Sequence, residues 1–253
     1  MVGCLSFLGR ILIYLKEMSE TKNLLRENLA KVRKRIEEAA QRCGRNAREI
    51  KLIAVSKTHS TRVLQDAMAA GATVFGENKV QEAEEKIEEL GKKNLEWHLI
   101  GHLQSNKARR AAKLFDVIHT LDSVELAERL ERICIEENRM SLSVLAQIDL
   151  AGEQAKNGIG EKGLPHLIEF LKNCERLKFD GLMIIPPFFE DMEKARPFFR
   201  RLREIRDEFL PSGELSMGMS HDFEIAIEEG ATLVRVGTAI FGAREKLSTV
   251  GHA

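Results

Sequence analysis

The chain has 253 residues, of which 43% are hydrophobic and 31% are charged. This length and apolar content suit one large α/β domain or two small ones. Lysine plus arginine and aspartate plus glutamate both total 39, and the resulting net charge of zero argues against a nucleic-acid-binding protein. The four cysteines form no CxxC pair, so we expect neither a disulfide scaffold nor a zinc site, and we predict no metal. The cytoplasm is the default location.

The first 17 residues are considered separately from the rest. The run LSFLGRILIYL is apolar but short, and Arg10 interrupts it, whereas a membrane-spanning helix needs about 20 apolar residues. No small-residue cleavage site follows, so a signal peptide is not indicated either. Residues 1–17 are either an amphipathic extension or lie upstream of a true start at Met18, and we favour the second. We expect residues 18–253 to form a single domain with no membrane contact.

From Lys22 onward, apolar residues recur every three or four positions, which predicts a helix that ends near Gly44. Short strand-like runs then alternate with helical runs. The predicted strands are residues 51–56, 73–75, 96–100, 117–120, 143–149, 179–184, 214–216 and 233–236, and the helices between and after them are 62–70, 80–90, 106–113, 124–137, 164–174, 191–209 and 222–229. Eight such strands predict an α/β fold, a single TIM (β/α)8 barrel with an extra N-terminal helix. We interpret the acidic residues of helix 80–90 as a solvated outer face: Glu82, Glu84, Glu85, Glu88 and Glu89.

Barrel chemistry lies at the carboxyl ends of the strands, in the loops that lead to the helices. Lys57 follows the first strand there, on the same face as Ile53 and Val55. It is either a snorkelling end residue or a functional amine. Glu77 and Asn78 follow the second strand and are placed at the same mouth.

Two turns near the end of the chain, LSMGMSHDFEIAI and LVRVGTAIFG, resemble a phosphate-binding cradle. Phosphate sites in barrels commonly follow strands seven and eight. Ser220 is predicted to be the N-cap of the next helix, and that role alone is the simpler interpretation. Gly237 allows close backbone approach and Thr238 adds a hydroxyl. An amine that faces such a cradle suggests pyridoxal 5′-phosphate (PLP) held as a Schiff base.

Arg235 lies in the last strand between two valines that would face the helices, so its side chain is expected to point into the barrel. A guanidinium there needs hydrogen-bond acceptors. The nitrogen of a pyridine ring is one such acceptor, and a buried ion pair with a carboxylate at another strand end is the alternative.

The sequence resembles the YggS/PROSC family of pyridoxal-phosphate homeostasis proteins over nearly all of residues 22–245. The resemblance rests on several ordered motifs, which together are more specific than any one of them. They are AVSKT at 54–58, GENKVQE at 76–82, WHLIGHLQSNK at 97–107, KNGIG at 156–160, GLM at 181–183, LSMGMSHDFEIAI at 215–227 and VRVGTAIFGAR at 234–244.

The resemblance implies a barrel similar to the N-terminal domain of alanine racemase, without its second domain. It implies that Lys57 holds PLP as an internal aldimine and that Arg235 approaches the pyridine nitrogen, which would weaken the cofactor as an electron sink. The implied cofactor-binding residues are Lys57, Asn78, His98, Met219, Ser220, Arg235, Gly237 and Thr238; no catalytic residue is implied.

The expected function is therefore PLP binding for intracellular PLP homeostasis, by buffering or delivery, with little or no turnover. One alternative is a PLP-dependent amino-acid enzyme such as a racemase. A racemase needs a second base opposite the lysine, which is a tyrosine in alanine racemase, and the one tyrosine of this chain is Tyr14. Another is a barrel enzyme that joins Lys57 to a phosphorylated carbonyl substrate. The expected partners are PLP, amino acids and PLP-dependent apo-enzymes; the sequence identifies neither the recipients nor the oligomeric state.

Overall fold

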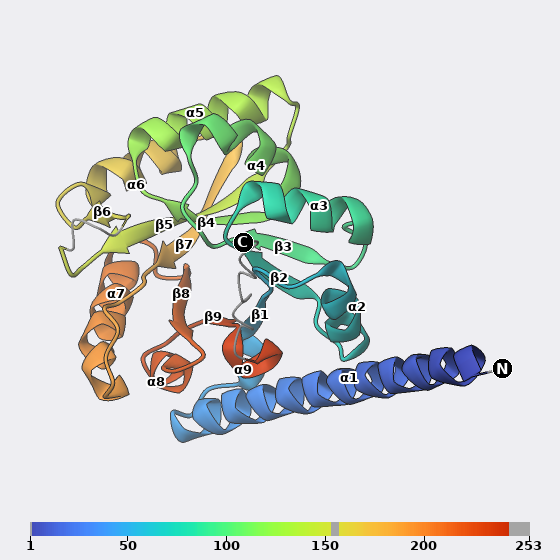
Figure 1. Ribbon diagram of the computed structural model, residues 1–253. Helices are drawn as coiled ribbons and strands as arrows, with labels where there is room; N and C mark the ends of the chain where they lie inside the picture. Colours follow the sequence, from blue (N-terminus) through green and yellow to red (C-terminus); the bar gives the residue numbers. More distant parts are fainter. Residues whose placement is uncertain (1, 153–156, 243–253) are drawn as a thin grey trace, which may run out of the picture.

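Eight parallel strands close into a barrel in the computed structural model, which describes residues 2–152 and 157–242, with side chains from residue 21 onward (Figure 1). The strands are β1 (Lys51–Val55), β2 (Val74–Glu77), β3 (Glu96–Leu99), β4 (Val117–Leu121), β5 (Leu142–Asp149), β7 (Leu177–Met183), β8 (Glu214–Met219) and β9 (Leu233–Val236). Each pairs with the next in this order, and β9 pairs with β1, where Arg235 lies opposite Ile53. The predicted TIM barrel is confirmed. A short strand that was not predicted, β6 (Ile159–Gly160), extends the sheet beside the end of β5.

Helices cover the outside of the barrel (Figure 1). They are α2 (Thr61–Ala69), α3 (Val80–Leu90), α4 (Ala108–Leu114), α5 (Val124–Glu136), α6 (Leu164–Lys172), α7 (Arg196–Phe209), α8 (Phe223–Glu228) and α9 (Thr238–Phe241), with 3-10 turns η1 (Ala47–Glu49), η2 (Ser105–Lys107) and η3 (Met192–Ala195). Local sequence sets their starts: the Ser123 hydroxyl accepts the Leu126 N–H at the start of α5, and Pro165 and Pro197 lie in the first turns of α6 and α7.

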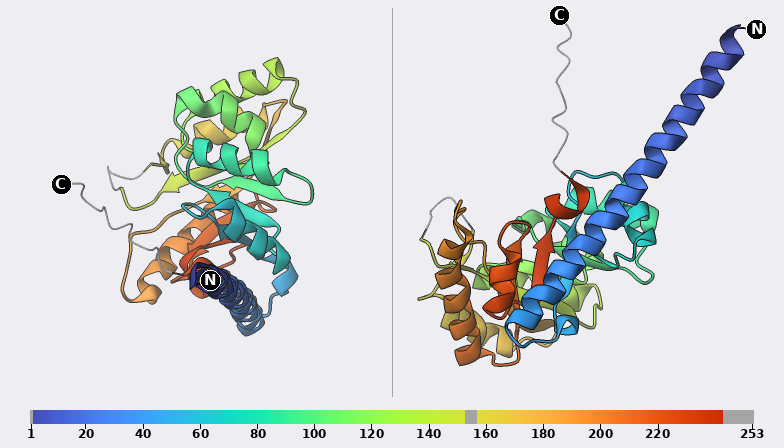
Figure 2. Two further views of the ribbon diagram at one scale, coloured as in Figure 1. Left: turned by 45° about the vertical axis from the view of Figure 1, so that its right-hand side comes forward. Right: turned by 90° about the horizontal axis from the view of Figure 1, so that it is seen from below.

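The extra N-terminal helix, α1 (Val2–Arg42), packs along α2, α8 and α9, and its amino-terminal part extends beyond the barrel (Figure 2). Its stripe of buried residues includes Leu25, Leu29 and Val32, as the periodicity predicts. Gly44 ends it in the left-handed conformation, with φ of 70°. The helix continues unbroken through Met18, and the division of the chain at that residue stays a prediction. In the part of the chain described, no helix has the length and apolar character needed to cross a bilayer.

The core has an outer and an inner layer. The outer layer, between strands and helices, holds the largest fully buried side chains: Trp97, Phe75, Phe115, Phe199 and Phe223. Inside the barrel, the apolar cluster of buried side chains is much smaller and consists of Ile53, Leu145, Met183 and Leu233. Polar side chains that contact one another, those of His98, His119, Ser216 and Arg235, are also buried.

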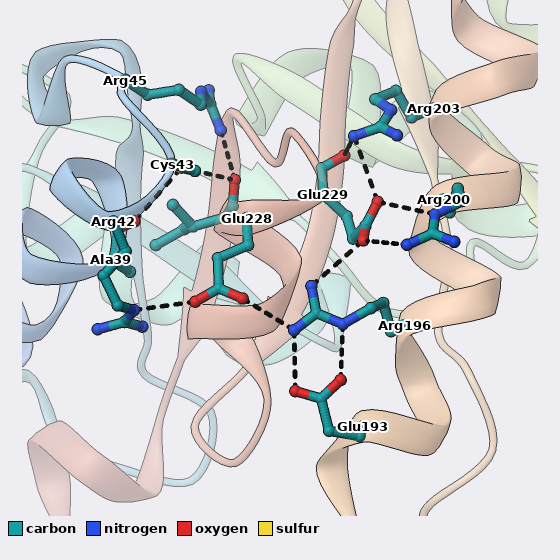
Figure 3. A network of polar contacts seen from close by, with 11 residues as sticks. Ala39, Arg42, Cys43, Arg45, Glu193, Arg196, Arg200, Arg203, Glu228 and Glu229 are labelled. Carbon is teal, nitrogen blue, oxygen red and sulfur yellow. Dashed lines mark hydrogen bonds and ion pairs between the residues drawn. The ribbon is translucent and has the colours of Figure 1, made fainter.

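Ion pairs hold α8 in place from two sides (Figure 3). Glu228 accepts hydrogen bonds from Arg42 of α1 at 3.0 Å and from Arg196 of α7 at 2.8 Å. The neighbouring carboxylate, Glu229, is buried and contacts three arginines of α7: Arg196, Arg200 and Arg203. Because α8 directly follows the turn after β8, these contacts fix the position of that turn.

Candidate functional site

Four neighbouring strands bring the predicted site residues to one end of the barrel. The order of adjacent strands is β2, β1, β9 and β8, all parallel, so their carboxyl ends lie side by side. Lys57 follows β1, Asn78 follows β2, Ser220 follows β8, and Gly237 follows β9. The amine and the two turns of the predicted phosphate cradle therefore open to the same mouth.

The two turns of the cradle are joined by a hydroxyl group. Ser220 Oγ accepts the N–H of Gly237 at 3.1 Å and the N–H of Ala239 at 3.4 Å. Thr238, the first residue of α9, is exposed beside them. This mouth thus presents a serine hydroxyl, a threonine hydroxyl and backbone N–H groups within one short segment.

The predicted role of Ser220 as a helix N-cap is wrong. Helix α8 begins at Phe223 with Asp222 as its N-cap, and Asp222 Oδ1 accepts the Met219 N–H at 2.7 Å. The turn before it needs Gly218 at φ of 88°, and a Cβ there would lie 2.6 Å from the Ala226 Cβ. Ser220 belongs to this turn and precedes the N-cap of the helix. Its hydroxyl is therefore directed to the loop after β9 instead.

Met219 lies beside the cradle and is 37% exposed. It lines a mostly apolar cavity of about 210 Å³ together with Ile185, Pro186, Pro187, Phe188, Phe189, Met192, Ala195, His221 and Asp222. Its side chain therefore borders the mouth on the side of β7 and β8.

Arg235 is buried in the barrel, with 3% of its surface exposed, as its alternation with two valines predicts. Its Nη1 donates to Ser216 O at 2.8 Å and to Ser216 Oγ at 2.5 Å, and its Nη2 donates to Ile184 O at 2.9 Å. Burial lowers the pKa of Arg235 to about 10, although Asp222 opposes this effect. Among the described residues no carboxylate forms an ion pair with it, so the predicted alternative of a direct buried ion pair is not found there.

His98 lies in the barrel interior with 1% of its surface exposed. Its Nε2 is 2.9 Å from Glu96 Oε1 and its Nδ1 is 2.7 Å from His119 Nε2. It lines a cavity at the amino ends of the strands, and it is linked to Arg235 only through other side chains. Its predicted contact with the cofactor stays a prediction.

The loop that carries Lys57 is held by a buried cluster that the sequence analysis missed. Lys86 of α3, only 4% exposed, donates to Ser56 O at 2.8 Å, to Glu77 Oε1 at 2.8 Å and to Glu82 Oε1 at 2.7 Å. Ser56 Oγ also donates to Glu77 Oε1 at 2.6 Å. Burial raises the pKa of Glu77, and the Lys86 charge opposes that rise.

Two predictions about acidic residues are corrected by this cluster. The sequence predicts Glu77 at the mouth, but it is the last residue of β2 and its side chain is fully buried beside α3. The sequence predicts Glu82 on the solvated face, yet it accepts hydrogen bonds from Lys86 and from the Thr58 N–H. Thr58 has φ of 69°, an unfavourable conformation for a β-branched residue, and the Glu82 contact holds it there. Both residues that flank Lys57 are therefore fixed to α3.

Asn78 borders a cavity of about 220 Å³ at the mouth, lined also by Ile100, Gly101, His102, Gln147, Asn157 and Ile185. Its Oδ1 is buried and has no hydrogen-bond partner. Gly101 packs so closely that a Cβ there would lie 2.2 Å from Asn78 O. No cluster of three or more His, Cys, Asp or Glu side chains suited to a metal occurs in the described ranges.

Comparison with known proteins agrees with this fold. Residues 28–245 match the family model of the alanine racemase N-terminal domain. The pyridoxal phosphate homeostasis protein of Aquifex aeolicus is 43% identical over 226 residues, which covers 87% of this chain and 98% of that protein. PipY of Synechococcus elongatus, solved with PLP bound, is 39% identical, has a TM-score of 0.73, and covers 86% of this chain and 100% of that one.

Alanine racemase of Corynebacterium glutamicum shares the fold alone: it is 16% identical with a TM-score of 0.63, over 91% of this chain and 63% of that one. The fold and the matched range thus define a barrel of the alanine racemase N-terminal-domain class. Within that class, the chain belongs to the family of pyridoxal phosphate homeostasis proteins.

Proposed function

We propose that this protein binds PLP at the carboxyl end of the barrel and takes part in intracellular PLP homeostasis, with Lys57 as the covalent attachment point. The observation that carries the proposal is the placement of Lys57 and the Ser220–Gly237 turns on adjacent strand ends. The name of the Aquifex relative and the PLP-bound state of PipY support the same cofactor.

The residues at the mouth fit such a group. The Asn78 Oδ1 atom is buried without a partner, so it is available to a donor on the cofactor. The backbone N–H groups of Gly237 and Ala239 converge on one hydroxyl, in an arrangement that also suits a phosphate. Arg235 uses three of its five N–H groups in the contacts given above, which leaves donors for the ring nitrogen.

PLP supplies an aldehyde that a neutral amine can attack, forming a carbon–nitrogen double bond with loss of one water molecule. Lysine ordinarily has a pKa of about 10.4, so the protein must favour the neutral amine. Lys57 is half-buried, and the buried Arg235 lies at the same end of the barrel.

The direct test is to add PLP to the purified protein and to record its absorption before and after treatment with borohydride, followed by peptide mapping. We expect a long-wavelength band that borohydride abolishes, and one labelled peptide that contains Lys57. A protein that takes up no PLP under these conditions would exclude the proposal.

Anchoring through the phosphate gives a second expectation. Two charge-assisted hydrogen bonds at the Ser220–Gly237 turns contribute about 3 kcal/mol together, so pyridoxal without its phosphate should bind about 100-fold more weakly than PLP. Equilibrium titration of both compounds, monitored by absorption, measures the ratio. Equal dissociation constants would show that the cradle does not hold the phosphate.

The protein is proposed to be a carrier with little turnover rather than a racemase. Racemisation needs a second base on the opposite face of the substrate α-carbon. The chain's one tyrosine, Tyr14, lies outside the residues whose side chains are described. His98, the other residue considered for this role, is directed to Glu96 and His119 within the barrel.

Incubation of the PLP-loaded protein with L-alanine in deuterated water should therefore leave the α-proton and the chirality essentially unchanged. Proton NMR and chiral chromatography measure the two quantities separately. Rapid formation of D-alanine that disappears in the Lys57→Ala variant would favour the alternative, a PLP-dependent amino-acid enzyme. We also expect that the protein delivers PLP to PLP-dependent apo-enzymes and that it is located in the cytoplasm.

A further inference from the structure

A continuous path of polar contacts crosses the interior of the barrel below the mouth. Arg235 Nη1 donates to Ser216 Oγ at 2.5 Å, and this hydroxyl is 2.8 Å from His119 Nδ1. His119 Nε2 is 2.7 Å from His98 Nδ1, and His98 Nε2 is 2.9 Å from Glu96 Oε1. We call these five residues, contributed by β9, β8, β4 and β3, the barrel relay. Every side chain in it except that of Glu96 is buried.

The far end of the barrel relay reaches the cavity at the amino ends of the strands. Lys51 Nζ donates to both carboxylate oxygens of Glu96, at 2.8 and 2.9 Å. The cavity has a volume of about 380 Å³ and is lined by Lys51, Glu96, His98, Val117, Ser143, Leu145, Lys178, Asp180, Ser212, Glu214 and Leu233. The relay thus joins a guanidinium near one mouth to an ion pair at the opposite mouth.

The protonation states in the relay are constrained by the groups at its two ends, Glu96 and Arg235. Hydrogen bonds from His98 and Lys51 lower the pKa of Glu96 to about 2, so its carboxylate is ionised and can only accept. Burial lowers the pKa of both His98 and His119, which favours neutral imidazoles. An arginine, at the other end, can only donate.

Only one direction of donation satisfies these conditions. His98 must carry its hydrogen on Nε2 to donate to Glu96, which leaves Nδ1 as an acceptor. His119 must then carry its hydrogen on Nε2, and its Nδ1 accepts the hydroxyl hydrogen of Ser216. The Ser216 lone pairs remain free to accept from Arg235. Every donor therefore points from Arg235 toward Glu96, and both nitrogens of each imidazole have a hydrogen-bond partner.

We propose that the barrel relay acts on the cofactor from the opposite end of the barrel. Its members other than Arg235 are positioning residues that hold the guanidinium charged and fix its orientation toward the ring nitrogen of PLP, so this inference rests on the proposed function. The Glu96 carboxylate supplies the compensating charge, because each bond in the chain is polarised by the next. An arginine held in this way keeps its proton and leaves the ring nitrogen unprotonated, which suits storage of the cofactor rather than turnover.

The first test needs no cofactor. Long-range ¹H–¹⁵N spectra of the cofactor-free protein report the protonation of each imidazole nitrogen, and single substitutions assign the two signals. We expect neutral rings with the hydrogen on Nε2 for both His98 and His119. A charged ring, or a hydrogen on Nδ1 of either residue, would overturn the direction of the relay.

The second test uses the PLP-loaded protein. Glu96→Gln removes the charge at the far end, and Ser216→Ala removes the hydroxyl link while keeping the carbonyl that Arg235 also uses. We expect each variant to shift the absorption maximum of the bound cofactor and to weaken PLP binding about tenfold. Asp180→Asn is the matched control, because Asp180 pairs with Lys178 at 2.8 Å in the same cavity but lies outside the relay.

Wild-type absorption and affinity in either Glu96→Gln or Ser216→Ala would overturn the proposal, as would an equal change in Asp180→Asn. The outcomes separate this inference from the proposed function. If the wild-type protein takes up no PLP, the proposed function fails and the relay's action on the cofactor fails with it. If the wild-type protein takes up PLP and Glu96→Gln has the same absorption maximum and affinity, the proposed function stands and only the inference about the relay is overturned.

Discussion

Lys57→Ala is expected to abolish the cofactor label that borohydride fixes to the protein. The reduced bond forms only where a lysine amine has condensed with the aldehyde, and Lys57 is the lysine that follows β1, between Ser56 and Thr58. The variant should retain weak, non-covalent PLP binding through the phosphate turns. Intact-protein mass spectrometry after borohydride treatment measures the label, and the long-wavelength band should disappear with it.

Lys79→Ala is the matched control for this prediction. Lys79 is an exposed lysine at the same end of the barrel, immediately before α3. The Lys79→Ala variant should keep the full label, because it leaves Lys57 and the phosphate turns unchanged. Label that persists in Lys57→Ala on another lysine would assign the attachment point to that residue.

Much of the fold could be predicted because barrel strands and helices have strong local patterns. Helix 80–90 and strand 233–236 match the structure residue for residue, since each has a clear apolar period and clear end signals. β6 could not be predicted: two residues are too few for a period, and the strand exists only because Ile159 pairs with Ile148 of β5. Register between distant segments is not visible in one sequence.

The site was predictable to the extent that it follows from the barrel topology. Parallel strands place Lys57, Asn78 and Gly237 at one end whatever their sequence separation. The cap at Ser220 was predicted wrongly because serine before a helix usually caps it, and the left-handed Gly218 turn shifted the helix start.

The residues missed altogether depend on burial across elements. His119 and Ser216 lie on strands far apart in sequence, and only the closed barrel brings their polar atoms within 2.8 Å. In the sequence, nothing distinguishes Lys86 from the other charged residues of an exposed helix. A glutamate four residues before it was a visible signal of an ion pair, but the second carboxylate, on β2, was not.

Lys86→Met is expected to destabilise the protein by about 3–5 kcal/mol at neutral pH, because it leaves the buried Glu77 carboxylate without its cation. Methionine keeps most of the side-chain volume, so the loss reports charge rather than a cavity. In the variant the pKa of Glu77 should rise further above its ordinary value of 4.5. The folded variant then keeps a proton that the folded wild type releases, so the deficit should grow as the pH rises through the already raised pKa of Glu77 in the wild type and level off above its still higher pKa in the variant. Urea unfolding at several pH values measures both effects.

Lys34→Met is the matched control for this stability loss. Lys34 also pairs with a glutamate, Glu38, at 3.7 Å one turn along a helix, but both side chains are at least half exposed. Such a pair contributes about 0–1 kcal/mol, so this variant should be nearly as stable as the wild type. The double variant Lys86→Met with Glu77→Gln should recover most of the loss, since it removes both buried charges and keeps an acceptor for the Ser56 hydroxyl. A loss for Lys86→Met as small as that of Lys34→Met would mean that the cluster does not hold the Lys57 loop in place.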